Sequence, residues 1–177
     1  MLSVLDHVAN HHHQHHQKKK MFGTVSHELE ANVPASVAWE LYGTLRLAKL
    51  AEEEAPEVIN KVDLLEGDGG VGTVLRVNFP PDTPGFTSHK EKFVKVDNEK
   101  RVKDAEVIEG GFLDLGFSLY RVRFEIIEKG EESCILKSTI EYDVKEEAAA
   151  NASIVTIQPL AHIAELAKNY LIKTKTN

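Results

Sequence analysis

The sequence has one cysteine, fewer basic than acidic residues and no long apolar run, and each of these features excludes a class of protein. The single cysteine, Cys134, has no partner for an internal disulfide, which is typical of a reducing compartment. The net charge of -7 disfavours nucleic acid, because a phosphate backbone needs a basic face. No apolar stretch approaches the roughly 20 residues that span a bilayer. We therefore expect a cytoplasmic protein that binds neither nucleic acid nor membranes.

The chain divides into a leader and one domain. Residues 1–20 hold clustered histidines and a lysine run without hydrophobic periodicity, so we interpret them as a disordered leader. The histidines could hold zinc or nickel adventitiously, but no acidic or cysteine ligand lies nearby, and we expect no structural metal site. Residues 21–177 have the length and composition of a single globular domain.

The hydrophobic pattern predicts an α+β domain. Apolar and polar residues alternate from Phe22 to Ala31, which is typical of a half-buried strand. Pro34 begins a short helix, and a second helix is predicted at 47–55. Six strands bounded by turn residues follow, at 58–66, 71–79, 87–97, 101–109, 116–128 and 132–145. Their short connections predict an antiparallel meander.

A long amphipathic helix is predicted after Lys145. Glutamates lie near its positive N-terminal end, lysines lie toward its C-terminal end, and an apolar stripe runs between them. Pro159 falls inside this segment and is expected to kink it, because proline removes one backbone hydrogen bond. The order of elements indicates a sheet wrapped around this helix.

Two local motifs lack the context that a functional signature needs. Residues 67–72 satisfy G-x-G-x-x-G, but a dinucleotide site requires this motif at the start of a helix. A strand-like segment follows instead, so we predict a glycine-rich hairpin turn and no bound cofactor. Asn151-Ala152-Ser153 is a formal glycosylation sequon. We interpret it as an unmodified cap region at a helix N-terminus.

Glu91 and Lys103 lie on the two strands that the turn at 97–100 would join into a hairpin. Their side chains could then face one pocket, and a carboxylate and an amine beside a cavity suit amine and carbonyl chemistry. The alternative is a cross-strand ion pair at the surface or rim, which is a common arrangement in sheets. The residues themselves leave both arrangements open.

Several segments resemble one plant family. They are residues 66–73, 90–93, 97–99, 109–116 and 137–142. From about Met21 to Leu171 the sequence resembles the pathogenesis-related class 10 proteins, the birch pollen allergen superfamily, and within it the norcoclaurine synthase branch. It also resembles norbelladine synthase, a relative that joins an amine to an aldehyde without ring closure. The resemblance implies a helix-grip fold, in which a curved seven-stranded antiparallel sheet surrounds a long C-terminal helix and an internal ligand cavity.

The resemblance also implies a set of catalytic residues in that cavity. In norcoclaurine synthases a tyrosine, a glutamate, a lysine and an aspartate line it, and Glu91 and Lys103 match the glutamate and the lysine. His89 occupies the tyrosine position and Val122 the aspartate position. We therefore expect Lys103, Glu91 and His89 to be catalytic. The expected substrate-binding residues are Phe93, Val122, Tyr120, Phe124 and Phe112.

These residues suit the condensation of an arylethylamine with an aldehyde. A Lys103 ammonium can polarise the aldehyde oxygen and donate a proton, while Glu91 can hold the cationic amine and later act as a base. An imidazole exchanges protons near neutral pH, so His89 could replace the missing hydroxyl, although a solvent-facing role stays open. Without the aspartate, imine formation is expected more than a strong, stereospecific Pictet-Spengler closure.

Two functions remain open from the sequence. The first is a cofactor-free enzyme of the norcoclaurine or norbelladine synthase kind, acting on dopamine or tyramine and an aryl aldehyde in alkaloid biosynthesis. The alternative is a non-catalytic protein that binds or stores plant hormones, flavonoids or alkaloids, with a defence-related role. A monomer or a weak homodimer is expected in either case.

Overall fold

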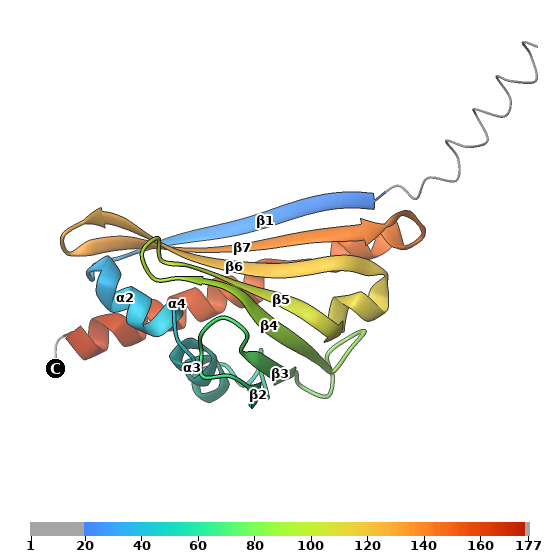
Figure 1. Cartoon of the computed structure of the whole chain (residues 1–177), viewed down its shortest axis with the longest axis horizontal. Helices are drawn as coiled ribbons and strands as arrows, with labels where there is room; N and C mark the ends of the chain where they lie inside the picture. The colour runs from blue at the N-terminus through green and yellow to red at the C-terminus, as the bar shows by residue number, and fades with distance from the viewer. Residues whose placement is uncertain (1–19, 176–177) are drawn as a thin grey trace, which may run out of the picture.

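A curved sheet wraps around one long helix in the computed structural model of the chain (Figure 1). The structure describes residues 20–175. The predicted leader lies outside this range except for Lys20, which already belongs to the first strand. Within the described range, no helix is long and apolar enough to cross a membrane.

The described residues form seven strands, three α-helices and two short 3-10 helices. They are β1 (Lys20–Ala31), α2 (Ala35–Tyr42), α3 (Arg46–Glu54), β2 (Lys61–Glu66), β3 (Val74–Asn78), β4 (Ser88–Asp97), β5 (Val102–Gly110), η1 (Gly111–Leu115), β6 (Phe117–Gly130), β7 (Ser133–Lys145), η2 (Glu146–Ile154) and α4 (Gln158–Lys175).

The strands form one seven-stranded antiparallel sheet in the order β1-β7-β6-β5-β4-β3-β2. This order puts β1 and β2, which are consecutive strands in the chain, at opposite edges of the sheet. Helices α2 and α3 make the connection between the two edges (Figure 1). The fold class, the sheet and the long C-terminal helix agree with the sequence prediction.

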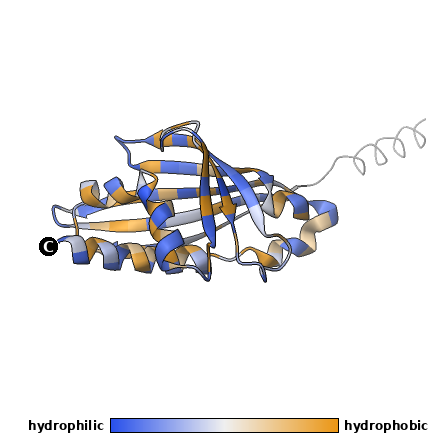
Figure 2. Ribbon diagram, turned by 90° about the horizontal axis from the view of Figure 1, so that it is seen from below, coloured by the Kyte–Doolittle hydropathy of each residue, from blue (hydrophilic) through white to orange (hydrophobic). Residues whose placement is uncertain are grey.

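One face of α4 packs against the concave side of the sheet. Its buried residues are Ile163, Ala164, Ala167 and Leu171, and the two small alanines let the helix lie close to its neighbours. The main core joins this face to α2, α3 and the inner residues of β6 and β7. Along the strands, apolar and polar residues alternate, as the colouring of Figure 2 shows. The burial of β7 follows the same alternation over most of its length.

The predicted continuous helix after Lys145 is wrong. The chain forms the 3-10 helix η2, passes through an extended residue at Val155, and begins α4 at Gln158. Pro159 therefore lies in the first turn of α4 and does not kink a helix interior, because a first-turn residue needs no N–H donor. The Thr156 hydroxyl accepts a hydrogen bond from the Gln158 backbone N–H at 3.2 Å and marks this new start.

The glycine-rich segment 67–72 is a turn between β2 and β3, as predicted. Gly67 has φ +86°, and a side chain there would come within 2.7 Å of Thr73 Cα. The buried Thr73 hydroxyl accepts from Gly69 N–H at 2.8 Å and donates to the Gly70 carbonyl at 2.7 Å. Backbone hydrogen bonds of 2.8 Å between this turn and Phe93 then fix the turn to β4.

Replacing Thr73 with valine is expected to destabilise the protein by about 1–3 kcal/mol, because the isosteric side chain leaves the buried Gly69 N–H without its acceptor. The matched control is Thr87→Val, at an exposed position, which should change stability by less than about 0.5 kcal/mol. Urea denaturation of the three proteins measures the difference. Equal midpoints for the two variants would contradict the role assigned to Thr73.

Candidate functional site

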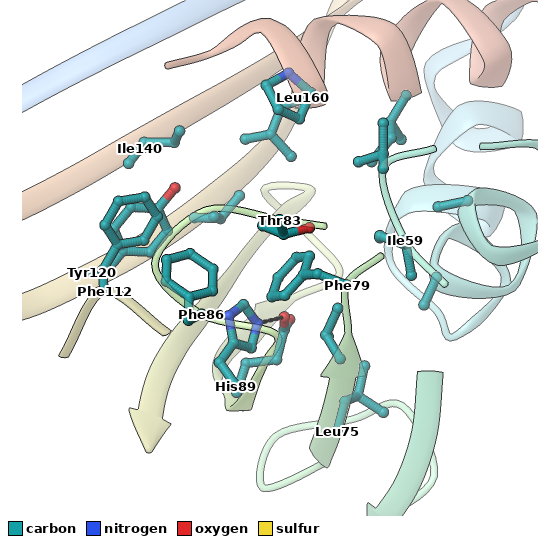
Figure 3. A pocket seen from close by; sticks show the side chains of 18 of the residues that line it. Ile59, Leu75, Phe79, Thr83, Phe86, His89, Phe112, Tyr120, Ile140 and Leu160 are labelled. Atoms are coloured by element: carbon teal, nitrogen blue, oxygen red, sulfur yellow. Dashed lines mark hydrogen bonds and ion pairs between the residues drawn. The ribbon is translucent and has the colours of Figure 1, made fainter. Parts of the chain in front are cut away.

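A cavity of about 750 Å³ lies between the concave face of the sheet, α4 and the connecting segments (Figure 3). Its size falls within the range of small-molecule pockets, and most of its lining is apolar. The cavity is lined by each residue that the sequence suggested for the site: His89, Glu91, Phe93, Lys103, Phe112, Tyr120, Val122 and Phe124.

Strand register explains how residues of β4 and β5 reach the same cavity. His89, Glu91 and Phe93 alternate along β4 and therefore share one face. A register shift after Phe93 then places Val96 opposite Lys103 of β5. Without this bulge the alternation would bring Lys95 to that position.

Lys103 is buried although it is a lysine, with only 3% of its surface exposed. Its Nζ lies 4.6 Å from the centre of the Phe93 ring and 5.5 Å from that of Phe124. It donates one long hydrogen bond of 3.4 Å to the Thr44 carbonyl. Burial lowers the pKa of Lys103 to about 8, and the charge of Glu91 opposes this shift only in part.

Glu91 does not form the surface ion pair with Lys103 that the sequence also allowed. The two residues are not cross-strand partners, because Glu91 faces Val107 in the register and Lys103 faces Val96. Within residues 20–175, no carboxylate lies within 4.0 Å of Lys103 Nζ. The carboxylate and the amine thus share a cavity without neutralising each other by direct contact.

His89 is the partner of Glu91. Its Nε2 lies 2.8 Å from Glu91 Oε1, and the dashed line in Figure 3 marks this contact. His89 Nδ1 is buried without a hydrogen-bond partner on the side of Gly111, where an added Cβ would lie 3.2 Å from it. We therefore assign the proton to Nε2, because a proton on Nδ1 would have no acceptor. In this arrangement His89 donates to Glu91 and orients its carboxylate.

Aromatic rings form the wall beyond this polar group. Tyr120 stacks on Phe112 with ring centres 4.2 Å apart, and burial, followed by the Glu91 charge, raises the pKa of the Tyr120 hydroxyl. Phe86 packs edge-on against Phe112 at 5.0 Å and against Phe79 at 5.4 Å (Figure 3). The site therefore combines an aromatic slot with a small number of polar groups.

Sequence reasoning missed several parts of the lining. The loop 83–86 between β3 and β4, the segment 57–59 after α3, and residues of η2 and α4 also contact the cavity. The loop 83–86 has no helical or strand period, and the patterns over 58–66 and the C-terminal helix did not indicate which residues face the cavity. Asn151, expected as a helix cap, lies within η2 and donates a hydrogen bond of 2.8 Å to the Leu115 carbonyl. It thereby links η2 to η1 at one end of the cavity.

Within the described residues, no group of three or more His, Cys, Asp or Glu side chains is placed to hold a metal ion. The clustered histidines of the leader lie outside that range. Cys134 is buried in the core, and burial raises the pKa of its thiol to about 11.

Comparison with known proteins places these features in a family. Residues 20–173 match the model of the Pathogenesis-related protein Bet v 1 family. Norbelladine synthase of Narcissus pseudonarcissus is 54% identical over 89% of this chain and 96% of its own length. S-norcoclaurine synthase 2 of Papaver somniferum is 40% identical over 85% of this chain and 66% of its own length.

The structure of norcoclaurine synthase from Thalictrum flavum, in complex with dopamine and hydroxybenzaldehyde, has a similar fold. Its TM-score is 0.78 at 36% sequence identity, over 87% of this chain and 88% of that chain.

Burial of Lys103 predicts a pH-dependent cost to folding. Its pKa falls from 10.5 to about 8, so the unfolded chain binds more protons at this residue between those values. The cost is about 3 kcal/mol below pH 8 and is relieved as the pH rises toward 10.5. We expect Lys103→Met to be more stable than the unchanged protein at pH 7, with the difference shrinking by pH 10.

Chemical denaturation at the two pH values measures this difference. The control is Lys92→Met, at an exposed position of β4, whose effect should not change with pH. A pH-independent effect of Lys103→Met would show that the buried amine does not carry the cost.

Proposed function

The chain belongs to the pathogenesis-related protein Bet v 1 family, and on that premise we propose that it condenses a phenolic arylethylamine with an aryl aldehyde in alkaloid biosynthesis. Dopamine and tyramine are the proposed amines, and the enzyme is a norcoclaurine synthase-like lyase. The observation that carries the proposal is the presence of a buried lysine and a carboxylate, not paired with each other, in one aromatic cavity.

The proposed reaction begins with the orientation of both substrates. Glu91, held by the His89 hydrogen bond, binds the cationic amine of the arylethylamine and takes up a proton as this amine becomes a nucleophile. The Lys103 ammonium polarises the aldehyde oxygen. It then donates a proton to the carbinolamine oxygen as water leaves, which gives the imine.

The remaining lining residues orient the substrates and exclude water. The stacked Phe112 and Tyr120 offer a flat surface to an aromatic ring, and the Tyr120 hydroxyl stays protonated because its pKa is raised. Phe93 and Phe124 flank the lysine and exclude water from the reacting atoms. In this proposal His89 acts through Glu91 and does not itself transfer a proton to the substrate.

An open-chain imine is the favoured product. Pictet-Spengler closure requires a base that removes a proton from the aromatic ring while the amine stays held, and Val122 adds no second carboxylate to share these two tasks with Glu91. The 54% identity to a norbelladine synthase, above the 40% identity to a norcoclaurine synthase, supports the same choice.

Storage of a hydrophobic plant metabolite is the second candidate function. The size and apolar lining of the cavity favour it, since these features would bind an aromatic guest without any chemistry. In both cases we propose a cytoplasmic monomer or weak homodimer. The single buried cysteine supports the reducing compartment.

Glu91→Gln is expected to lower the rate of condensation by about 100-fold or more, because the amide cannot bind the cationic amine as an ion or accept its proton. The control Glu109→Gln removes an exposed carboxylate and should retain activity. Imine formation from dopamine and 4-hydroxyphenylacetaldehyde, trapped with borohydride and quantified by mass spectrometry, measures both. Product at the uncatalysed rate from the unchanged protein, with undiminished ligand binding, would favour the storage function.

Val122→Asp is expected to raise the share of cyclised product, because it places a carboxylate in the cavity wall beside the aromatic substrate. The ratio of tetrahydroisoquinoline to borohydride-reduced imine, determined by mass spectrometry, reports the change. Val122→Asn is the matched control, since it has nearly the same shape without a basic carboxylate. An equal ratio for both variants would contradict the reason given for open-chain product.

A further inference from the structure

The amine of Lys103 has an unusual environment for a lysine. Most lysine ammonium groups remain in water or pair with carboxylates. Lys103 Nζ has instead two aromatic ring contacts and one long hydrogen bond to the Thr44 carbonyl. Within the part of the chain that the structure describes, no ion pair holds it in its charged form. The Lys103 nitrogen therefore borders the cavity without a carboxylate in contact with it.

We propose that Lys103 is also a nucleophile, and that its Nζ forms a covalent imine with the aldehyde, which the arylethylamine then displaces. The inference rests on the proposed function for its aldehyde substrate. It goes further than general acid catalysis, since it assigns a covalent bond between the chain and the substrate.

The atoms and protons of this route balance without an oxidant or a reductant. The Lys103 lone pair attacks the carbonyl carbon, and the proton lost from Nζ moves to the former carbonyl oxygen, which gives a carbinolamine. The substrate ammonium bound at Glu91 supplies the proton with which this oxygen leaves as water. The arylethylamine, now neutral, adds to the Lys103 iminium carbon. A proton then moves from the added substrate nitrogen to Nζ, the bond to Nζ breaks, and the substrate iminium and the neutral lysine amine are released.

The cavity provides what each step needs. Desolvation lowers the pKa of Lys103 to about 8, so the neutral amine is present near neutral pH while an ordinary lysine is almost wholly charged. The titratable groups that line the same cavity are Glu91 and His89 from β4, Tyr120 from β6, and the exposed Glu57 after α3. α4 contributes only apolar groups to the lining, namely Pro159, Leu160 and Ile163.

Neither His89 nor Tyr120 competes for the Lys103 proton. His89 donates to Glu91, and the raised pKa of Tyr120 keeps its hydroxyl protonated. The apolar wall excludes water, which would otherwise hydrolyse the lysine imine. Both protonation forms of Lys103 therefore have a role. The ammonium serves the acid-catalysed route and the amine serves the covalent one.

Reductive trapping tests the inference on the full chain. The protein is incubated with 4-hydroxybenzaldehyde alone and then with sodium borohydride, and labelled lysines are located by peptide mass mapping. We expect labelling at Lys103 at least tenfold above that of every other lysine, rising between pH 7 and pH 9. Lys103→Met should lose the adduct, and Lys92→Met, which removes an exposed lysine of β4, should keep it.

The mapping of the unchanged protein decides the matter even if Lys103→Met fails to fold. Labelling spread evenly over exposed lysines, with Lys103 unmodified, would overturn the inference. Its failure is distinct from failure of the proposed function, because condensation is assayed separately. Turnover without a Lys103 adduct leaves only the acid-catalysed route, whereas an adduct without turnover supports the nucleophile and rejects the condensing enzyme.

Discussion

The burial of one amine without an ion-pair partner is the constraint on which the rest of the site depends. Placing a lysine in an apolar wall costs free energy, which the fold recovers through the packing of the sheet around α4. In return the cavity holds a nitrogen whose protonation changes near pH 8. A lysine with a carboxylate in direct contact would stay charged at this pH and would be less available to a carbonyl group.

The scaffold keeps the carboxylate near this lysine but out of contact with it. The bulge after Phe93 places Val96, and not Lys95, opposite Lys103, and the register with β5 keeps Glu91 and Lys103 apart along the hairpin. The Glu91 carboxylate instead accepts a hydrogen bond from His89. The glycine-rich turn contributes through its backbone hydrogen bonds to Phe93, so its role is structural and it does not hold a phosphate. The bulge, the hydrogen bond and the turn together keep the Lys103 amine out of contact with the Glu91 carboxylate.

Local patterns predicted much of the fold, and they failed where a tertiary contact replaces a local one. Alternation and turn residues located every strand, although β2 has no buried residue and begins at Lys61, three residues later than predicted. They did not locate η1, where the short segment 111–115 has no period to detect. The pattern also predicted one helix where η2 and α4 are separate, because apolar residues continue through Val155 although the backbone is extended there. The loop 83–86 could not be assigned to the cavity, since the packing of Phe86 on Phe79 and on Phe112 brings it there.

The sequence by itself determined the order of the elements, the inward face of β4, and the family motif that singles out Glu91 and Lys103, because these depend on neighbours along the chain. Tertiary structure alone decided that Lys103 is buried without a carboxylate partner and that His89 orients Glu91. The reason is that desolvation is caused by groups remote in sequence. Thr44 and Phe124 approach the lysine only when the α2–α3 connection and β6 close over β5.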